Sequence, residues 1–408
     1  MDGDERSGRF DHLFAEPIRE TISLETYGAW RAVRSADAVS LSFGFPFPSS
    51  FPDQELIDAA EGLFEDEPEV ALQYGGGEYS KGLQDAIVER SRTRGIPCDP
   101  DDVVLTNGAT HAIDVVCRTF LDPGDGLIVE SPTFMGALYA FRNYGVTVDG
   151  CPMDEHGLDV EVLAETLRRR RDAGEGIPTL VYTIPTFQNP TGTTMSLDRR
   201  RRLLELAAEY DFVVLEDDAY GELRYEGAPV PTLAELDDDG RVVHVGTFSK
   251  TIAPGIRTGW AIAHEEIADA LKGVAVGGSN TFTRGLLGRY FHDGYYEETL
   301  EALRSEYAHR RDHMLACLER ELPPEATWTE PEGGFFVWVE FDAPVDTEEL
   351  LYDAAEEGVT FLPGSMFFPD EGGENALRIS FSYVSPEEME AGIEALGRAA
   401  RNMLDRIE

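Results

Sequence analysis

The sequence predicts an α/β protein with a mostly parallel sheet flanked by helices and a smaller α+β part. Short apolar runs alternate with helical stretches over residues 100–285, which is typical of parallel strands joined by crossover helices. The chain has 408 residues, enough for two domains and a large core, and no internal repeat or low-complexity linker interrupts it. We predict a large domain at 50–285 and a small domain formed by 1–49 and 286–408.

The individual elements follow from apolar periodicity and from turn residues. The segment 40–52 is rich in Pro, Gly and Phe, which predicts an ordered turn rather than a helix. Helices are predicted at 24–34, 53–65, 81–94, 158–173, 197–210, 284–318 (with a break near 292–294), 347–357 and 386–405. Strands are predicted at 102–106, 126–130, 179–185, 212–215, 242–245, 334–339 and 376–382.

The charge balance is extreme and spread along the whole chain. Asp and Glu number 78 against 34 Lys and Arg, a formal net charge of −44. Such self-repulsion is best tolerated where salt screens it, so we hypothesise a halophilic protein from a salt-rich cytoplasm. The acidity also argues against nucleic acid as a partner, because that binding needs a basic surface.

Membrane and metal functions are not expected either. No apolar run approaches the length of a membrane span, and the polar N-terminus resembles neither a signal nor a transit peptide, so we expect a cytoplasmic protein with no membrane contact. The four cysteines (Cys98, Cys117, Cys151 and Cys317) form no CxxC pair, which favours buried thiols over a disulfide framework or a metal site.

A strand that ends in a lysine is the most informative feature. The apolar run 242–245 continues through small and hydroxyl residues to Lys250, in a chain that contains only three lysines. A surface lysine is the simple alternative, but Thr247, Ser249 and Arg257 lie close in sequence and together offer donors for a phosphate dianion. A lysine beside a phosphate cradle is what a pyridoxal-phosphate enzyme needs, because the amine forms a Schiff base and the cradle anchors the cofactor.

Three other stretches offer groups for the same kind of ligand. Residues 102–113 predict a strand, a glycine turn and a helix, whose free N–H groups would bind an anion. Glu216, Asp217 and Asp218 end a buried strand, where acids are costly unless a positive group such as a protonated pyridine faces them; a solvated acidic turn is the alternative. Arg378 lies in a strand of alternating apolar residues. It is either a residue of the solvated face or a guanidinium that binds the carboxylate of a ligand.

Taken in order, these motifs resemble fold-type I, class I/II aminotransferases that depend on pyridoxal 5′-phosphate. The lysine segment resembles S/T-x-S-K-x-x-x-P-G-x-R-x-G, the turn around Asn189 resembles P-x-x-Q-N-P-T-G, and L-R-I-S-F around Arg378 resembles R-I/L-x-F-S. The chain departs from the family at Gly44-Phe45-Pro46, where G-G-x-P is common, and at Tyr79, where Gly is usual. It looks most like the 2-aminoadipate and aromatic aminotransferases, a group also related to the aminotransferase domain of MocR-type regulators.

The resemblance implies a role for each matching residue. Lys250 would be the catalytic residue, bound to the cofactor and moving a proton once freed. The cofactor phosphate would be held by Gly108, Ala109, Thr110, Thr247, Ser249 and Arg257, and by Tyr74 of a second subunit. The cofactor ring would be held by Phe134, Asn189, Asp217 at the pyridine nitrogen, and Tyr220. The substrate would contact Gly44, Asn189 and Arg378, whose guanidinium would bind the α-carboxylate.

The resemblance therefore implies a homodimeric transferase of amino-acid metabolism with shared active sites. It would move an amino group between an aromatic, 2-aminoadipate-type or branched-chain L-amino acid and a 2-oxo acid such as 2-oxoglutarate, with ping-pong kinetics. A pyridoxal-phosphate lyase or decarboxylase on the same fold is one alternative. A non-catalytic ligand-sensing domain is another, and the acidic charge argues against it. Phe43, Phe45 and Phe47 indicate either an apolar substrate pocket or a core.

Overall fold

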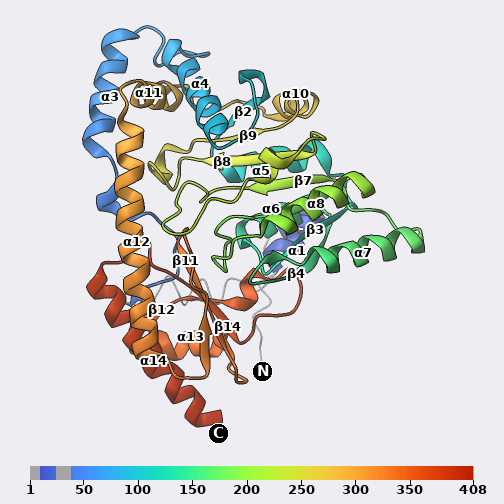
Figure 1. Ribbon diagram of the computed structural model, residues 1–408, viewed down its shortest axis with the longest axis vertical. Coiled ribbons are helices and arrows are strands. Elements are labelled where there is room, and N and C mark those ends of the chain that lie inside the picture. The colour runs from blue at the N-terminus through green and yellow to red at the C-terminus, as the bar shows by residue number, and fades with distance from the viewer. Residues whose placement is uncertain (1–9, 24–37, 408) are drawn as a thin grey trace.

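Two sheets organise the protein, one large and mostly parallel, the other small and antiparallel (Figure 1). The computed structural model describes residues 10–23 and 38–407. The predicted fold class is confirmed. The helix that we predict at 24–34 lies outside the described residues.

The large sheet has eight strands in the order β2-β9-β8-β7-β6-β3-β4-β5. The neighbours from β8 through β7, β6 and β3 to β4 are parallel, whereas β9 runs antiparallel to β8 and β2. Its strands are β2 (Val103–Thr106), β3 (Gly126–Ser131), β4 (Thr147–Asp154), β5 (Gly157–Leu158), β6 (Leu180–Thr183), β7 (Val213–Asp217), β8 (Val242–Thr247) and β9 (Gly259–Ile262). Every residue of β6 and β8 is buried, as expected for strands covered on both faces.

Helices cover both faces of the large sheet, and successive strand residues face opposite helix layers. Leu215 of β7 packs in one core and Val214 in the other, because side chains alternate along a strand. The first layer is α5 (Ala109–Phe120), α6 (Met135–Arg142) and α10 (Glu265–Val274). The second layer is α7 (Val160–Ala173), α8 (Leu197–Tyr210) and α9 (Leu233–Leu236).

The small sheet is built from the C-terminal part of the chain. It has the order β10-β11-β14-β13, with all neighbours antiparallel. Its strands are β10 (Ala326–Trp328), β11 (Phe336–Phe341), β13 (Leu362–Pro363) and β14 (Ala376–Ser380), and it packs with α13 (Thr347–Glu357) and α14 (Pro386–Ile407). Beside it, β1 (Val39–Ser40) pairs in parallel with β12 (Val359–Thr360).

One long helix, α12 (Tyr295–Glu321), is shared by two hydrophobic cores (Figure 1). Its first half, including Tyr296 and Leu303, packs with α3 (Asp53–Asp66), α4 (Glu78–Thr93) and α11 (Thr281–His292). Its second half, including Met314 and Leu318, lies in the core of the small sheet. The predicted break is confirmed at Gly294, which has φ 83° and separates α11 from α12. The two-domain division that we predict stays a prediction.

The remaining predictions compare well with the structure. Helix α4 begins at Glu78, three residues before the predicted start, because an acid is favourable in a first helical turn. All four cysteines are free and buried, as predicted. None of the described helices is long and apolar enough to span a lipid bilayer. The short helical segments are α1 (Glu16–Ser23), η1 (Asp11–Leu13), η2 (Pro48–Ser50), η3 (Pro100–Asp102), η4 (Pro254–Ile256) and η5 (Gly364–Phe367).

Candidate active site

The candidate site lies beyond the carboxyl ends of β6, β7 and β8. These strands are parallel neighbours, so the turns that follow them meet at one edge of the sheet. Asn189 follows β6, Asp217 is the last residue of β7, and Lys250 comes three residues after β8. The sheet order thus places three of the predicted site residues at one edge.

Lys250 is held against a segment from the other end of the chain. Its Nζ donates a hydrogen bond to the carbonyl oxygen of Gly44 at 2.9 Å. Burial, together with the positive charges of Arg378 and Arg257, lowers the pKa of Lys250 to about 8, while the negative charge of Asp217 acts in the opposite direction. At pH 7 roughly a tenth of this amine is then neutral, far more than for an ordinary lysine, and the neutral form is the one that can accept a proton.

Asp217 presents one carboxylate oxygen without a protein partner. The residue is 4% exposed, and its Oδ2 accepts a hydrogen bond from Tyr182 at 2.8 Å. Its Oδ1 is buried and has no hydrogen-bond partner. Burial raises the pKa of Asp217 to about 6, the bond from Tyr182 lowers it, and the neighbouring charge of Asp218 raises it. An orphaned buried carboxylate oxygen is costly, and a ligand that carries an N–H or a positive charge would satisfy it.

Hydroxyl and guanidinium groups line the other end of the site. Thr247 Oγ1 donates to Ser249 Oγ at 2.9 Å. Arg257 Nη2 donates to the carbonyl oxygen of Asn107 at 3.0 Å, which brings the guanidinium to the turn before α5. Arg257 has φ 50°, a left-handed conformation that is uncommon for a non-glycine residue and typical of functional sites.

The glycine turn before α5 leaves room for a ligand at the helix N-terminus. Gly108 has φ 93°, and a Cβ placed there would lie 2.8 Å from the guanidinium of Arg257. The turn leads directly into Ala109 and Thr110, the first residues of a helix of 12 residues. The N–H groups in the first turn of a helix have no partners within the helix and attract anions. The Arg257 guanidinium and these N–H groups therefore form a cradle suited to phosphate.

Arg378 joins the small sheet to the turn after β6. Its Nη1 donates to Asn189 Oδ1 at 2.8 Å, and its Nη2 donates to the carbonyl oxygen of Ser42 at 2.6 Å. Its guanidinium lies over the rings of Phe336 and Phe367, at 4.1 and 4.9 Å from their centroids. Burial lowers the pKa of Arg378 to about 9, and its Nε has no hydrogen-bond partner.

Two aromatic residues predicted for the cofactor ring lie on this side of the sheet. Tyr220 is 5% exposed and meets the rings of Phe335 and Phe336 edge-on. Burial raises the pKa of its hydroxyl, so Tyr220 is a neutral hydrogen-bonding group. Phe134 precedes α6, and a Cβ on Gly136 would lie 2.4 Å from its ring.

Tyr74, like Thr110 and Arg257, is an exposed residue among those predicted for the site. Its side chain is 96% exposed on the single chain. Its backbone N–H donates to Gln73 Oε1 at 2.8 Å. A large aromatic side chain so exposed in one chain is compatible with a contact to a second chain.

The structure adds residues that the sequence did not point to. Glu130, at the end of β3, is 1% exposed and accepts hydrogen bonds from Ile184 N and Gln188 Nε2, both at 3.1 Å. Gln188 also donates to the carbonyl oxygen of Pro132 at 2.9 Å, which ties the turn before Phe134 to the turn that carries Asn189. An acid at the end of a buried run is the signal that pointed to Asp217, and it would have found Glu130. Tyr182 gave no signal within an apolar strand.

The geometry fits pyridoxal phosphate as a test ligand. The orphaned oxygen of Asp217 would accept an N–H from a pyridinium ring. The turn at Gly108 and the Arg257 guanidinium would hold the phosphate, and the amine of Lys250 offers a nucleophile of lowered pKa. The donors and acceptors thus match the two charged ends and the reactive carbon of this cofactor.

Comparison with known proteins agrees with this reading. The family described as aminotransferase class I and II matches residues 40–396. An aromatic-amino-acid aminotransferase of Thermococcus litoralis is 38% identical over 399 residues, covering 96% of this chain and 93% of the relative. A 2-aminoadipate transaminase of Thermus thermophilus is 37% identical over 396 residues, which cover 96% of this chain and 95% of the relative. The crystal structure of a kynurenine aminotransferase of Pyrococcus horikoshii, in complex with PMP, superposes with a TM-score of 0.91 at 37% identity. The superposition covers 97% of this chain and 99% of that protein.

Proposed function

Because this chain belongs to the class I and II aminotransferases, and is therefore a pyridoxal-phosphate-dependent enzyme, we propose that it acts on aromatic, 2-aminoadipate-type or branched-chain L-amino acids. The amino-group acceptor would be a 2-oxo acid such as 2-oxoglutarate. The relatives named for aromatic amino acids and for 2-aminoadipate support this range of substrates.

The observation that carries the proposal is that Lys250 and Arg378 are held by one segment. Lys250 Nζ bonds to Gly44 O at 2.9 Å, and Arg378 Nη2 bonds to Ser42 O at 2.6 Å. An α-amino acid carries its carboxylate and its acidic proton on the same carbon, Cα. A guanidinium and a base fixed on neighbouring carbonyls match that pair of groups.

We assign the chemistry to this chain's own residues as follows. When bound, pyridoxal phosphate supplies an electron sink for the negative charge that develops at the substrate Cα. Arg378 binds the substrate carboxylate and orients Cα. Lys250 Nζ takes the Cα proton and returns a proton on the cofactor side. Asp217 holds the ring nitrogen protonated.

The remaining predicted residues would position the cofactor. Tyr220 and Asn189 would bind its phenolic oxygen, and Phe134 would stack on the ring. The phosphate would be held by Gly108, Ala109, Thr110, Thr247, Ser249 and Arg257. These roles rest on the family motifs, and the geometry of the cradle supports them.

Aromatic side chains beside Gly44 support an apolar substrate side chain. Phe43 and Phe45 are stacked with their centroids 4.9 Å apart, and Tyr383 meets Phe45 edge-on at 5.9 Å. Phe45 is 48% exposed, so its ring is accessible to a ligand. A flat or long apolar side chain would cover this surface and gain from burial.

We also propose a homodimer in which Tyr74 reaches the partner's phosphate site. Leu72 and Val276 are also strongly exposed, at 73% and 81%, and would be covered in such an interface. Sedimentation of the wild type and of Leu72→Asp would test this: the proposal expects a dimer that the substitution weakens. A monomeric wild type would contradict it.

We propose that the enzyme works in a salt-rich cytoplasm. The net charge of −44 supports the need for salt, because counter-ions screen the repulsion among like charges. The four free, buried cysteines are compatible with a reducing compartment.

The decisive experiment is an absorbance spectrum of the purified protein in molar salt, before and after each member of a panel of L-amino acids. Conversion of the bound cofactor to its amine form, with release of a 2-oxo acid, would support transamination and rank the donors. Release of a product without the amine form would indicate a lyase or a decarboxylase. Absence of any cofactor band after added pyridoxal phosphate would refute the assignment of Lys250.

A further inference from the structure

Glu216 and Asp218 flank Asp217 in the sequence but lie on the opposite face of the sheet. Glu216 is paired directly with His244 of β8, whereas Asp217 bonds to Tyr182 on the other face. Glu216 and Asp218 are 0% and 6% exposed. Two carboxylates buried so close together repel each other and require positive partners.

His244 lies between these two carboxylates. Its Nδ1 is 2.9 Å from Glu216 Oε2, and its Nε2 is 3.8 Å from Asp218 Oδ2. The imidazole is 1% exposed. The Nδ1 contact is a hydrogen bond and the Nε2 contact is a longer, charge-range contact, so a positive charge on this ring would lie between two buried carboxylates and compensate both.

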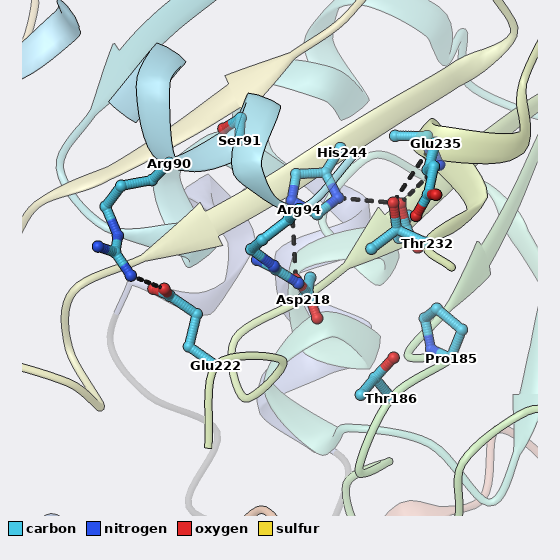
Figure 2. Close-up of polar contacts among 12 residues, drawn as sticks. Arg90, Ser91, Arg94, Pro185, Thr186, Asp218, Glu222, Thr232, Glu235 and His244 are labelled. Carbon is cyan, nitrogen blue, oxygen red and sulfur yellow. Dashed lines mark hydrogen bonds and ion pairs between the residues drawn. The ribbon is translucent and has the colours of Figure 1, made fainter. Parts of the chain in front are cut away.

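Arg94 contacts the same oxygen of Asp218 that His244 faces. It caps the end of α4, lines a groove of about 1770 Å³, and pairs with Asp218 Oδ2. Figure 2 shows Arg94 and His244 next to Asp218, while Arg90 of the same helix pairs separately with Glu222. The side chain of Arg94 is 26% exposed, so it is the accessible end of the network.

Glu216 has additional donors, and they show that it is held ionised. The backbone N–H groups of Leu233 and Ala234 donate to its two oxygens at 2.7 and 3.0 Å. Burial acts to raise the pKa of Glu216, but the bond and charge of His244, the charge of Arg200 and these N–H groups hold it below its usual value. Arg200 spreads its own hydrogen bonds over carbonyl oxygens such as those of Pro185 and Pro231.

The charged and titratable groups around Asp217 come from both faces of the sheet. On its own face these are Tyr182, Glu130, Tyr220 and Lys250, and on the other face they are Glu216, Asp218, His244, Arg94, Arg200 and Glu222. Glu222 has its own partner in Arg90. Asp218 is therefore matched by Arg94 and faces His244, and Glu216 is matched by His244, by the charge of Arg200 and by two backbone N–H groups.

We propose that His244 and Arg94 are positioning residues whose positive charges compensate Glu216 and Asp218, so that Asp217 stays ionised at neutral pH and receives the N–H of the cofactor ring. The proposal rests on the role proposed above for Asp217. The unpartnered Oδ1 of Asp217 is the atom that the network keeps available.

The pKa of Asp217 lies close to neutral pH, so a change in one nearby charge would change how much of Asp217 is ionised. The pKa of Asp217 is raised to about 6: burial and the charge of Asp218 raise it, and the bond from Tyr182 and the charge of His244 lower it. Loss of one nearby positive charge would move the proton affinity of Asp217 upward, towards neutral pH. Loss of one nearby negative charge would move it downward.

The test measures binding of pyridoxamine 5′-phosphate to the full-length protein by equilibrium dialysis between about pH 5 and pH 9. This ligand forms no bond with Lys250, so its affinity reports the ring and phosphate contacts. Affinity should fall on the acid side as Asp217 gains a proton. We expect His244→Gln and Arg94→Gln each to move this acid limb up by about one pH unit, and Glu216→Gln to move it down.

A charge-restoring pair separates electrostatic compensation from mere structural support. In His244→Gln/Glu216→Gln one positive and one negative charge are removed together, so the limb should return to the wild-type position. A structural role would instead give summed losses. Arg92→Gln is the matched control, because Arg92 lies on the same helix end and pairs with Asp99 at the surface, with side chains 53% and 78% exposed.

The outcomes distinguish the two proposals. If the wild type binds pyridoxamine phosphate but Arg94→Gln and His244→Gln leave the limb in place, or if the double variant is not restored, the inference is wrong and the proposed function stands. If the wild type does not bind this ligand, the proposed function fails first. Arg94 is partly exposed, so its variant tests the inference even where a change at buried His244 prevents folding.

Discussion

Lys250 Nζ donates a hydrogen bond to the carbonyl oxygen of Gly44, a residue 206 positions earlier in the chain. The contact connects the turn after β8 with the segment that leads from β1 into the small sheet's core. The segment fits closely, because a Cβ on Gly44 would come within 2.3 Å of the Phe336 ring. The position of the amine thus depends on a residue without a side chain.

The first prediction concerns that fit. Gly44→Ala should displace the segment and weaken the hold on Lys250, lowering kcat/KM about tenfold while cofactor binding remains. Steady-state kinetics with a good amino-acid donor would measure this. Gly82→Ala in α4 is the matched control, because its Cβ would have no atom within 4 Å; equal effects of the two changes would contradict the prediction.

The second prediction concerns Lys250 itself. Lys250→Ala should lower turnover by about a thousandfold or more, because no other described base lies at the end of β8. Reduction of the wild-type protein with borohydride should fix the cofactor on the peptide that contains Lys250. Lys272→Ala serves as the control, since Lys272 bonds to Asp101 O and Asp269 at the surface. Near wild-type turnover in Lys250→Ala would overturn the assignment.

The third prediction concerns pH. Tyr182 donates to Asp217 and lowers its pKa, so Tyr182→Phe should raise that pKa above about 6. Catalysis requires ionised Asp217. This form is present above the pKa and is lost as the pH falls through it. The acid limb of kcat/KM should therefore move to higher pH. An unshifted limb, with the fold intact by circular dichroism, would show that Tyr182 does not tune Asp217.

The fourth prediction concerns the substrate carboxylate. Arg378→Lys keeps the positive charge but loses the fork of donors, so KM for the amino acid should rise about a hundredfold. Amines that lack the α-carboxylate should lose far less. The ratio of kcat/KM for an amino acid to that for its amine analogue would measure the effect. An unchanged ratio would place the carboxylate elsewhere.

The fifth prediction concerns salt. The net charge of −44 should make the protein more stable in molar salt than in dilute buffer, with a melting temperature higher by about 5–10 °C. Thermal unfolding followed by circular dichroism would measure this. Sucrose at matched osmolality is the control, because it does not screen charge; equal stability in low and high salt would refute the halophilic hypothesis.

Much of the site was predictable because polar residues at the end of apolar runs are conspicuous. Asp217, Lys250 and Arg378 stood out for this reason, and the structure brings each to the same edge of the sheet or against it. Tyr74 could be named from its motif, but its contacts could not be predicted. Its proposed partner belongs to a second chain, and in the single chain Tyr74 is 96% exposed.

The rest depended on which strands are neighbours. Glu216 and His244 face each other only because β7 pairs with β8, and the sequence does not give that register. Arg94 resembles an ordinary basic residue at a helix end, and its bond to Asp218 spans 124 positions. Tyr182 is indistinguishable from a core residue until its hydroxyl is seen on Asp217. Local sequence patterns therefore do not predict which side chains from distant segments will pair.

The helix α12 also decides how the protein can bend. Its 27 residues extend about 40 Å as one rod, and each half is embedded in a different core. The small sheet therefore cannot swing relative to the large one without flexing this rod or slipping one half from its packing.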